Sequence, residues 1–120
     1  STMIDISTLE PDYELSYCNF TLPDPLKLFV IKREDGYFSG ILSAEKEKLG
    51  FFNGSNTGEE ISIYFSTISH GIFYENSYDF KLPKNQIMPG QVIEGNFRNA
   101  PRPGQPSSTA SGGTCFLRKC

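Results

Sequence analysis

With 120 residues, 38% of them hydrophobic, the chain is long enough for one domain with a single core and too short for two. Its net charge of −3 at pH 7 and its lack of long basic runs argue against nucleic-acid binding, which needs clustered cations. No apolar stretch approaches the ~20 residues of a membrane-spanning helix, so no membrane span is expected.

The N-terminal part of the chain predicts an arm, a strand and a hairpin. Residues 1–11 form the arm, and residues 13–20 are expected to form a first strand, with tyrosine and leucine alternating on one face. Residues 26–32 are apolar on both faces, which indicates a central strand buried on two sides. Asp35-Gly36 supplies the positive φ of a tight turn, so residues 37–42 should return antiparallel to the strand before them.

The segment 43–49 is the one stretch that fits a helix. Ser43 would cap its first turn and Gly50 would end it, although barely two turns are too short to be stable alone. A charged loop or a continued strand fits the same residues almost as well. A cluster of turn-forming residues follows at 53–58.

The second half of the chain predicts further short strands with turns between them. Residues 61–68 alternate cleanly, with isoleucine and phenylalanine on one face and Tyr64 on the other, and Ser69-His70-Gly71 breaks this strand. The other segments predicted as strands are 72–74, 78–82, 91–98 and 114–119. Residues 100–113 are rich in proline, glycine and serine and are expected to form a flexible loop before the last strand.

About seven or eight short strands with turn residues between them predict a single all-β domain over residues 1–120. The expected architecture is an antiparallel β-sandwich or a small β-barrel, with at most one short helix near 43–49. The spacing of the strands does not distinguish the sandwich from the barrel.

Three cysteines, Cys18, Cys115 and Cys120, lie in the first and last parts of the chain. The first and last strands of a closed β domain are often neighbours, so we expect a Cys18–Cys115 disulfide, with Cys18–Cys120 as the alternative. A Cys115–Cys120 bridge would need a turn, because five residues of strand separate two Cα atoms by roughly 16 Å. Three reduced thiols in a cytosolic protein is the competing interpretation.

Two further features favour an extracytoplasmic location. Asn19 and Asn53 begin N-glycosylation motifs, which would be used if the source is eukaryotic. The first residues lack the positive region and apolar core of a signal peptide, so if the protein is secreted, such a leader has already been removed. We expect a secreted, periplasmic or cell-surface protein, and a cytoplasmic location stays open.

The residues that could carry catalysis or bind a metal form no recognised pattern. His70 is the single histidine and lies in a turn, with nothing in the sequence to place a nucleophile and a carboxylate beside it. The cysteine spacing lacks the paired ligands of a zinc site. Residues 53–60 are similar to a calcium loop only superficially, because their two carboxylates both follow the glycine. We therefore predict no metal, no cofactor and no enzymatic activity.

The tyrosines are the most suggestive candidates for a binding surface. Tyr37, Tyr64, Tyr74 and Tyr78 could form an aromatic face for a sugar or a protein, because tyrosine is rigid and amphipathic. Aromatic pairing between strands would explain them equally without any ligand. Tyr64 is the best single surface candidate, since its neighbours on the strand point to the opposite face.

These observations give a ranked set of functions. The first is a non-enzymatic binding module, adhesin-like, inhibitor-like or part of a surface assembly, with a protein or carbohydrate partner contacting sheet-face tyrosines and loops. The second is a structural subunit of a larger particle, such as a capsid, tail or pilus component, for which homo-oligomers would form. The third is a small hydrolase using converging carboxylates such as Glu34, Glu59 and Glu60.

Overall fold

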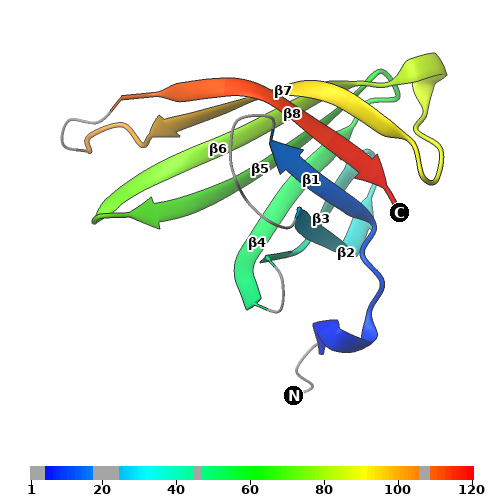
Figure 1. The fold of residues 1–120 in the computed structure, drawn as a ribbon, viewed down its shortest axis with the longest axis horizontal. Helices are drawn as coiled ribbons and strands as arrows, with labels where there is room; N and C mark the ends of the chain where they lie inside the picture. Colours follow the sequence, from blue (N-terminus) through cyan, green and yellow to red (C-terminus); the bar gives the residue numbers. More distant parts are fainter. Residues whose placement is uncertain (1–4, 18–24, 45–46, 106–108) are drawn as a thin grey trace.

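The computed structural model describes residues 5–17, 25–44, 47–105 and 109–120. Within them, eight strands form a closed antiparallel barrel in which each strand pairs with the next and β8 pairs back to β1 (Figure 1). The strands are β1 (Tyr13–Tyr17), β2 (Leu26–Glu34), β3 (Tyr37–Ala44), β4 (Glu47–Asn56), β5 (Glu60–Ser69), β6 (Ile72–Lys81), β7 (Val92–Pro101) and β8 (Ser111–Lys119). The all-β prediction is confirmed, and the architecture is the barrel.

Two tight turns join neighbouring strands with only two residues. Asp35 and Gly36 have φ values of 34° and 83°, and His70 and Gly71 have φ values of 50° and 76°. Positive φ at both central residues matches the right-handed twist of the flanking strands, and glycine adopts it at no steric cost. The predicted Asp35-Gly36 hairpin is confirmed, and His70 is an exposed turn residue.

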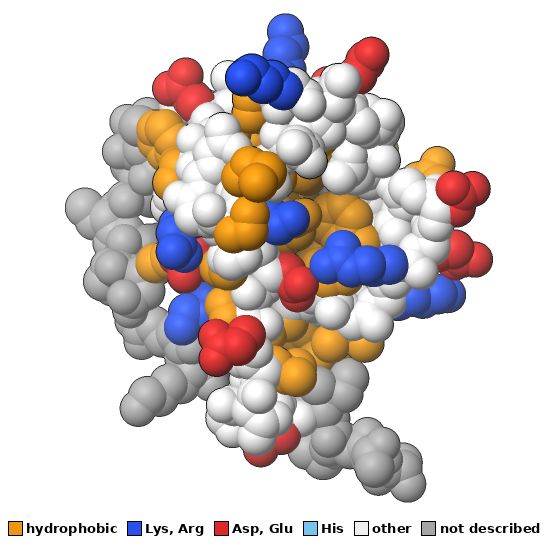
Figure 2. All heavy atoms as spheres, turned by 90° about the vertical axis from the view of Figure 1, so that its right-hand side faces the viewer, with side chains coloured by type: hydrophobic (Ala, Val, Ile, Leu, Met, Phe, Trp, Pro, Cys, Tyr) orange, Lys and Arg blue, Asp and Glu red, His pale blue; other side chains and the backbone are white. Residues whose placement is uncertain are grey.

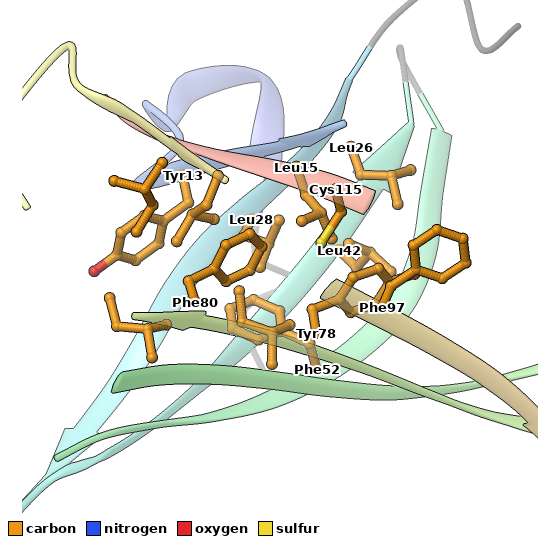
Figure 3. Packing of buried hydrophobic residues seen from close by; sticks show 14 of the residues in the cluster. Tyr13, Leu15, Leu26, Leu28, Leu42, Phe52, Tyr78, Phe80, Phe97 and Cys115 are labelled. Atoms are coloured by element: carbon orange, nitrogen blue, oxygen red, sulfur yellow. The ribbon is translucent and has the colours of Figure 1, made fainter. Parts of the chain in front are cut away.

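Side chains from all eight strands fill the barrel interior (Figure 3). In a barrel of eight strands, alternate residues point inward and leave little space between them. Tyr78 lies in the middle of this core, with its ring stacked between those of Phe65 and Phe97 at centroid distances of 5.4 and 6.0 Å. The described side chains of the interior therefore form one continuous core.

The described residues of the segment 43–49 form strands and no helix, so the continued strand is the alternative that the structure takes. β3 continues through Ala44, which pairs with Leu26 on one side and Glu47 on the other, and β4 begins at Glu47. Residues 45 and 46 lie outside the described residues. The ladder hydrogen bonds of a strand outweigh a local helix preference that spans barely two turns. The described helical segments are two single 3-10 turns, η1 (Ile6–Thr8) within the predicted arm and η2 (Pro83–Asn85).

Several predicted strands are longer than expected. The segments 72–74 and 78–81 belong to one continuous strand, β6, which pairs with β5 along its whole length, whereas Leu82 lies just beyond its end. The segment 100–113 is partly strand, because β7 runs to Pro101 and β8 begins at Ser111, while residues 106–108 lie outside the described residues. The predicted strand at 13–20 corresponds to β1 up to Tyr17, and its last three residues also lie outside the described part.

The surface carries charges of both signs. Figure 2 looks at the end of the barrel on the right-hand side of Figure 1 and shows lysine and arginine side chains interspersed with acidic ones, with hydrophobic side chains visible between them. Among the described residues, no helix is long and apolar enough to cross a membrane.

Candidate functional site: a tyrosine-walled trough

Three adjacent strands place two exposed tyrosines on the outer wall of the barrel. Tyr37 on β3 is opposite Ser55 on β4, which is opposite Ser62 on β5. Two residues further along, Asn53 on β4 is opposite Tyr64 on β5. Because side chains alternate between the two faces of a strand, these residues share the outer face. Tyr37 is 69% exposed and Tyr64 is 45% exposed.

Between the two tyrosines runs an open groove of about 600 Å³, here called the trough. Its lining residues are Asp35, Gly36, Tyr37, Gly54, Ser55, Asn56, Thr57 and Tyr64. The two tyrosines lie two strands apart, roughly 10 Å, so the width of β4 is open between them. The trough therefore has aromatic walls and a floor of small hydroxyl, amide and backbone groups.

Hydrogen bonds hold the turns at the rim of the trough in place. The backbone N–H of Asn56 donates to the carbonyl oxygen of Gly36 at 2.8 Å, which ties the two rim turns together. The Asn56 side-chain oxygen accepts from the backbone N–H of Gly58 at 2.8 Å, and the Thr57 hydroxyl accepts from that of Glu60 at 3.1 Å. A rim that is already ordered loses little conformational freedom when a ligand binds.

Glycine at position 54 lets the backbone beneath the trough lie directly on the core. Gly54 lies directly over the inward-facing ring of Phe38, and a Cβ added there would come within 2.3 Å of that ring. Phe38 in turn packs against Tyr13 and Phe52 in the core, at centroid distances of 6.1 and 6.0 Å. The backbone of β4 at Gly54 therefore lies between the trough and the packed core.

A second, smaller groove of about 230 Å³ lies on the other side of Tyr37. Its lining includes Lys32, Glu34, Ser39 and Asn53. The Lys32 Nζ and Glu34 Oε2 atoms form an ion pair at 3.4 Å. The Tyr37 side chain therefore lines both grooves. A ligand longer than the trough could extend past this ring onto the adjacent strand.

The structure brings together two of the four tyrosines predicted as a binding surface. Tyr78 is 1% exposed, so it belongs to the core and its assignment to the surface is wrong. Its strand alternates hydrophobic and charged residues, and Tyr78 lies on the hydrophobic side. Tyr74 is half-buried and pairs with Thr67 and Pro101, near the His70 turn, so it does not contribute to the trough.

The two glycosylation motifs have different positions. Asn53 is exposed on β4 beside the trough, so a glycan on it would cover the candidate site. Asn19 lies outside the described residues. Ser55 and Asn56, two polar residues that line the trough, fall within the predicted turn cluster, which the sequence already suggested as a contact region together with the tyrosines. Because β3, the strand after the Asp35-Gly36 turn, pairs with β4, Ser55 and Asn56 lie beside Tyr37 and line the trough.

The predicted disulfide is not formed. Cys115 and Cys120 are both free thiols, and Cys18 lies outside the described residues. The first and last strands are neighbours as expected, with Tyr17 opposite Cys115. The Cys115 side chain, however, is fully buried among core residues, where it packs as a small apolar group (Figure 3).

Burial, with the nearby charge of Asp79, raises the pKa of Cys115 from 9.0 to about 12. The folded state therefore holds the thiol proton more tightly than the unfolded state. Its stabilising contribution is complete below pH 9 and is lost as the pH rises from about 9 towards about 12. We expect the urea midpoint of unfolding to fall between about pH 8.5 and about pH 10.5, and Cys115→Ala to reduce this fall.

A labelling experiment checks the same group directly. Thiolate is the reactive form of cysteine, so native Cys115 should resist iodoacetamide at about pH 8 and react only after unfolding, whereas exposed Cys120 should react in both states. Peptide mass mapping reports each site separately. Rapid native labelling of Cys115 would contradict its place in the core.

No group of three or more His, Cys, Asp or Glu residues that could hold a metal ion is found within the described ranges. Comparison of the chain with protein-family models, with curated proteins and with solved structures found no match. The functional argument therefore depends on the geometry of the trough.

Proposed function

We propose that this protein is a non-enzymatic binding module that holds a neutral carbohydrate in the trough between Tyr37 and Tyr64. The observation that carries the proposal is the pair of exposed tyrosines on either side of a floor of hydroxyl and amide groups. A sugar ring has apolar C–H groups on its faces and hydroxyls around its edge. Aromatic rings cover the first, and side chains such as Ser55 and Asn56 can hydrogen-bond to the second.

The composition of the trough supports binding without catalysis. Asp35 is the one carboxylate among its lining residues, whereas glycoside hydrolysis generally uses a facing pair. Of the carboxylates considered for a hydrolase, Glu34 lies in the neighbouring groove, paired with Lys32. Glu59 lies in the turn after β4 and Glu60 begins β5, and neither lines the trough.

A secreted, periplasmic or cell-surface location remains part of the proposal. With Cys115 and Cys120 free, disulfide chemistry gives it no support. The proposed location is supported by the proposed ligand, because carbohydrate polymers are abundant on and around cell surfaces.

The test is binding to an array of neutral oligosaccharides, followed by calorimetry with the best ligand. We expect Tyr37→Ala and Tyr64→Ala each to weaken binding by at least about tenfold, the effect of losing a central aromatic contact. Their melting temperatures should change little, because both side chains are exposed. Val92→Ala removes an exposed apolar side chain on β7, outside the trough lining, and serves as the matched control.

Two outcomes would reject the proposal. One is an array on which no neutral oligosaccharide binds. The other is a ligand whose affinity is the same for the wild type and for the Tyr37→Ala/Tyr64→Ala double variant, since that ligand would use another surface. If a protein instead binds through Tyr37 and Tyr64, the trough is still the binding site, but its ligand is a protein and not a carbohydrate.

A further inference from the structure

The trough is part of a longer polar strip on the outer wall of the barrel. In one row across strands β2 to β5, pairing places four residues side by side, which are Lys32, Ser39, Asn53 and Tyr64. The neighbouring row, two residues away along each strand, consists of Glu34, Tyr37, Ser55 and Ser62. Because side chains alternate between the two faces of a strand, both rows lie on the outer face. These eight residues are here called the strip.

The composition of the strip suits an uncharged polar ligand along its whole length. Besides the two tyrosines and one lysine–glutamate pair, it consists of serine and asparagine. Hydroxyl and amide groups can both donate and accept hydrogen bonds, as the hydroxyls of a sugar do. The two charges, on Lys32 and Glu34, are paired with each other at 3.4 Å. The strip therefore continues the chemistry of the trough onto β2 and β3.

The two grooves on this wall are neighbours and share part of their lining. The trough extends over β3, β4 and β5, and the smaller groove extends over β2, β3 and β4. Tyr37 and Gly54 line both. Together the grooves cross four strands, which is three spacings between strands or roughly 14 Å. A ligand that occupies both grooves has to be extended and has to pass Tyr37.

The spacing of Tyr37 and Tyr64 favours two contacts with separate sugar units. The two residues differ by two strands across the sheet and by two residues along it, which separates their Cα atoms by roughly 12 Å. A single flat ring held between two aromatic faces needs those faces about 7–8 Å apart, because carbon atoms in contact are ~3.5–4.0 Å apart. Side chains stand roughly perpendicular to a sheet, so each tyrosine is placed to cover a different unit.

We propose that the ligand is a linear, uncharged oligosaccharide that lies across strands β2 to β5. One sugar unit contacts Tyr64 in the trough, another contacts Tyr37, and the chain continues into the smaller groove beside Ser39 and Asn53. This inference rests on the carbohydrate proposal and adds the length and the path of the ligand. Because linked units make each further contact intramolecular, affinity should rise with chain length until the strip is filled.

The test is calorimetry with sugars of increasing length. The probes are the cello-, manno-, xylo- and N-acetylchito-oligosaccharide series, each as one, two, four and six units. In the series that binds, we expect the hexasaccharide to bind at least about tenfold more tightly than the disaccharide, because only the longer chain reaches both grooves. Tyr37→Ala and Tyr64→Ala should both weaken binding of the hexasaccharide.

A variant of the smaller groove tests the path. Ser39 and Asn53 line the smaller groove and do not line the trough. Ser39→Ala/Asn53→Ala should weaken binding of the hexasaccharide by at least about fivefold, the effect of losing hydrogen bonds to the ligand, and change that of the disaccharide by less than about twofold. Asn96→Ala, at an exposed position on β7 that lines neither groove, is the matched control and should change neither affinity. Unchanged melting temperatures would show that all these variants are folded.

The possible failures separate this inference from the carbohydrate proposal. If no neutral sugar of any length binds, the carbohydrate proposal fails and this inference fails with it. If a single sugar or a disaccharide binds through Tyr37 and Tyr64 as tightly as the hexasaccharide, or if only branched sugars bind, the trough is a carbohydrate site and the extended path is wrong. Hexasaccharide binding that the Ser39→Ala/Asn53→Ala variant leaves unchanged, or weakens equally for the disaccharide, would also overturn the path.

Discussion

Replacing Tyr78 with alanine is expected to lower the free energy of unfolding by about 3–5 kcal/mol, the cost of removing a large aromatic side chain from a packed core. Tyr78 is 1% exposed, and its ring is stacked between Phe65 and Phe97. The interplanar angles of 15° and 27° show that the three rings lie nearly parallel. Removing the central ring therefore leaves both neighbours without a packing partner on one side.

The matched comparison is Tyr64→Ala, the same chemical change on the outer wall of the neighbouring strand. Because Tyr64 is exposed, its loss should cost less than about 1 kcal/mol. Urea unfolding of both variants measures the difference, and a drop in Tm of more than about 10 °C is expected for Tyr78→Ala alone. Equal effects would mean that Tyr78 is not at the centre of the core.

These two tyrosines also show how far the sequence could predict the site. The alternation of residues 61–68 is enough to place Tyr64 on the outer face, because isoleucine and phenylalanine occupy the other parity. The same reasoning applies to Tyr78, which shares its parity with Phe80 and alternates with Asp79 and Lys81. The surface prediction for Tyr78 relied on the residue being a tyrosine. Its position in the alternating pattern, on the same side of the strand as Phe80, predicts the buried face that it occupies in the barrel.

The trough required information that alternation does not contain. Tyr37 and Tyr64 are far apart in the sequence, and they become neighbours only because the register of β4 places Ser55 and Asn53 between them. Register depends on turn geometry and on the packing of the inner face. The Asp35-Gly36 turn was predictable from its residues, whereas the pairing of β4 with β5 was not.

The extent of pairing between β4 and β5 was beyond sequence reasoning for a related reason. Residues 61–66 keep the same alternating pattern past Tyr64, although β5 is paired with β4 only up to Tyr64. Where two strands diverge is decided by the coiling of the closed barrel, not by the pattern of either strand. Between a short helix and a continued strand at 43–49 the local residues could not decide, and the long-range ladder with β2 and between β3 and β4 decides it in favour of strand.

Gly40→Ala is expected to lower the free energy of unfolding by about 3 kcal/mol or more, at the upper end of the cost of overpacking. A Cβ at this position would lie 1.8 Å from the carbonyl oxygen of Phe29 and 3.0 Å from the backbone nitrogen of Ile31. These are backbone atoms of β2, so no side-chain rotation can relieve the contact. β2 and β3 would have to separate where the register of β2 shifts, between Val30 and Lys32.

Ser39→Ala, one residue earlier on the outer face of β3, is the control and should change stability by less than about 0.5 kcal/mol. Urea unfolding measures both variants. A Gly40→Ala protein that fails to fold would agree with the expected clash, provided that Ser39→Ala expresses as folded protein. A Gly40→Ala variant as stable as Ser39→Ala would show that β3 does not approach β2 so closely. The close approach matters for function, because β3 carries Tyr37, and a shift of this strand would move one wall of the trough away from Tyr64.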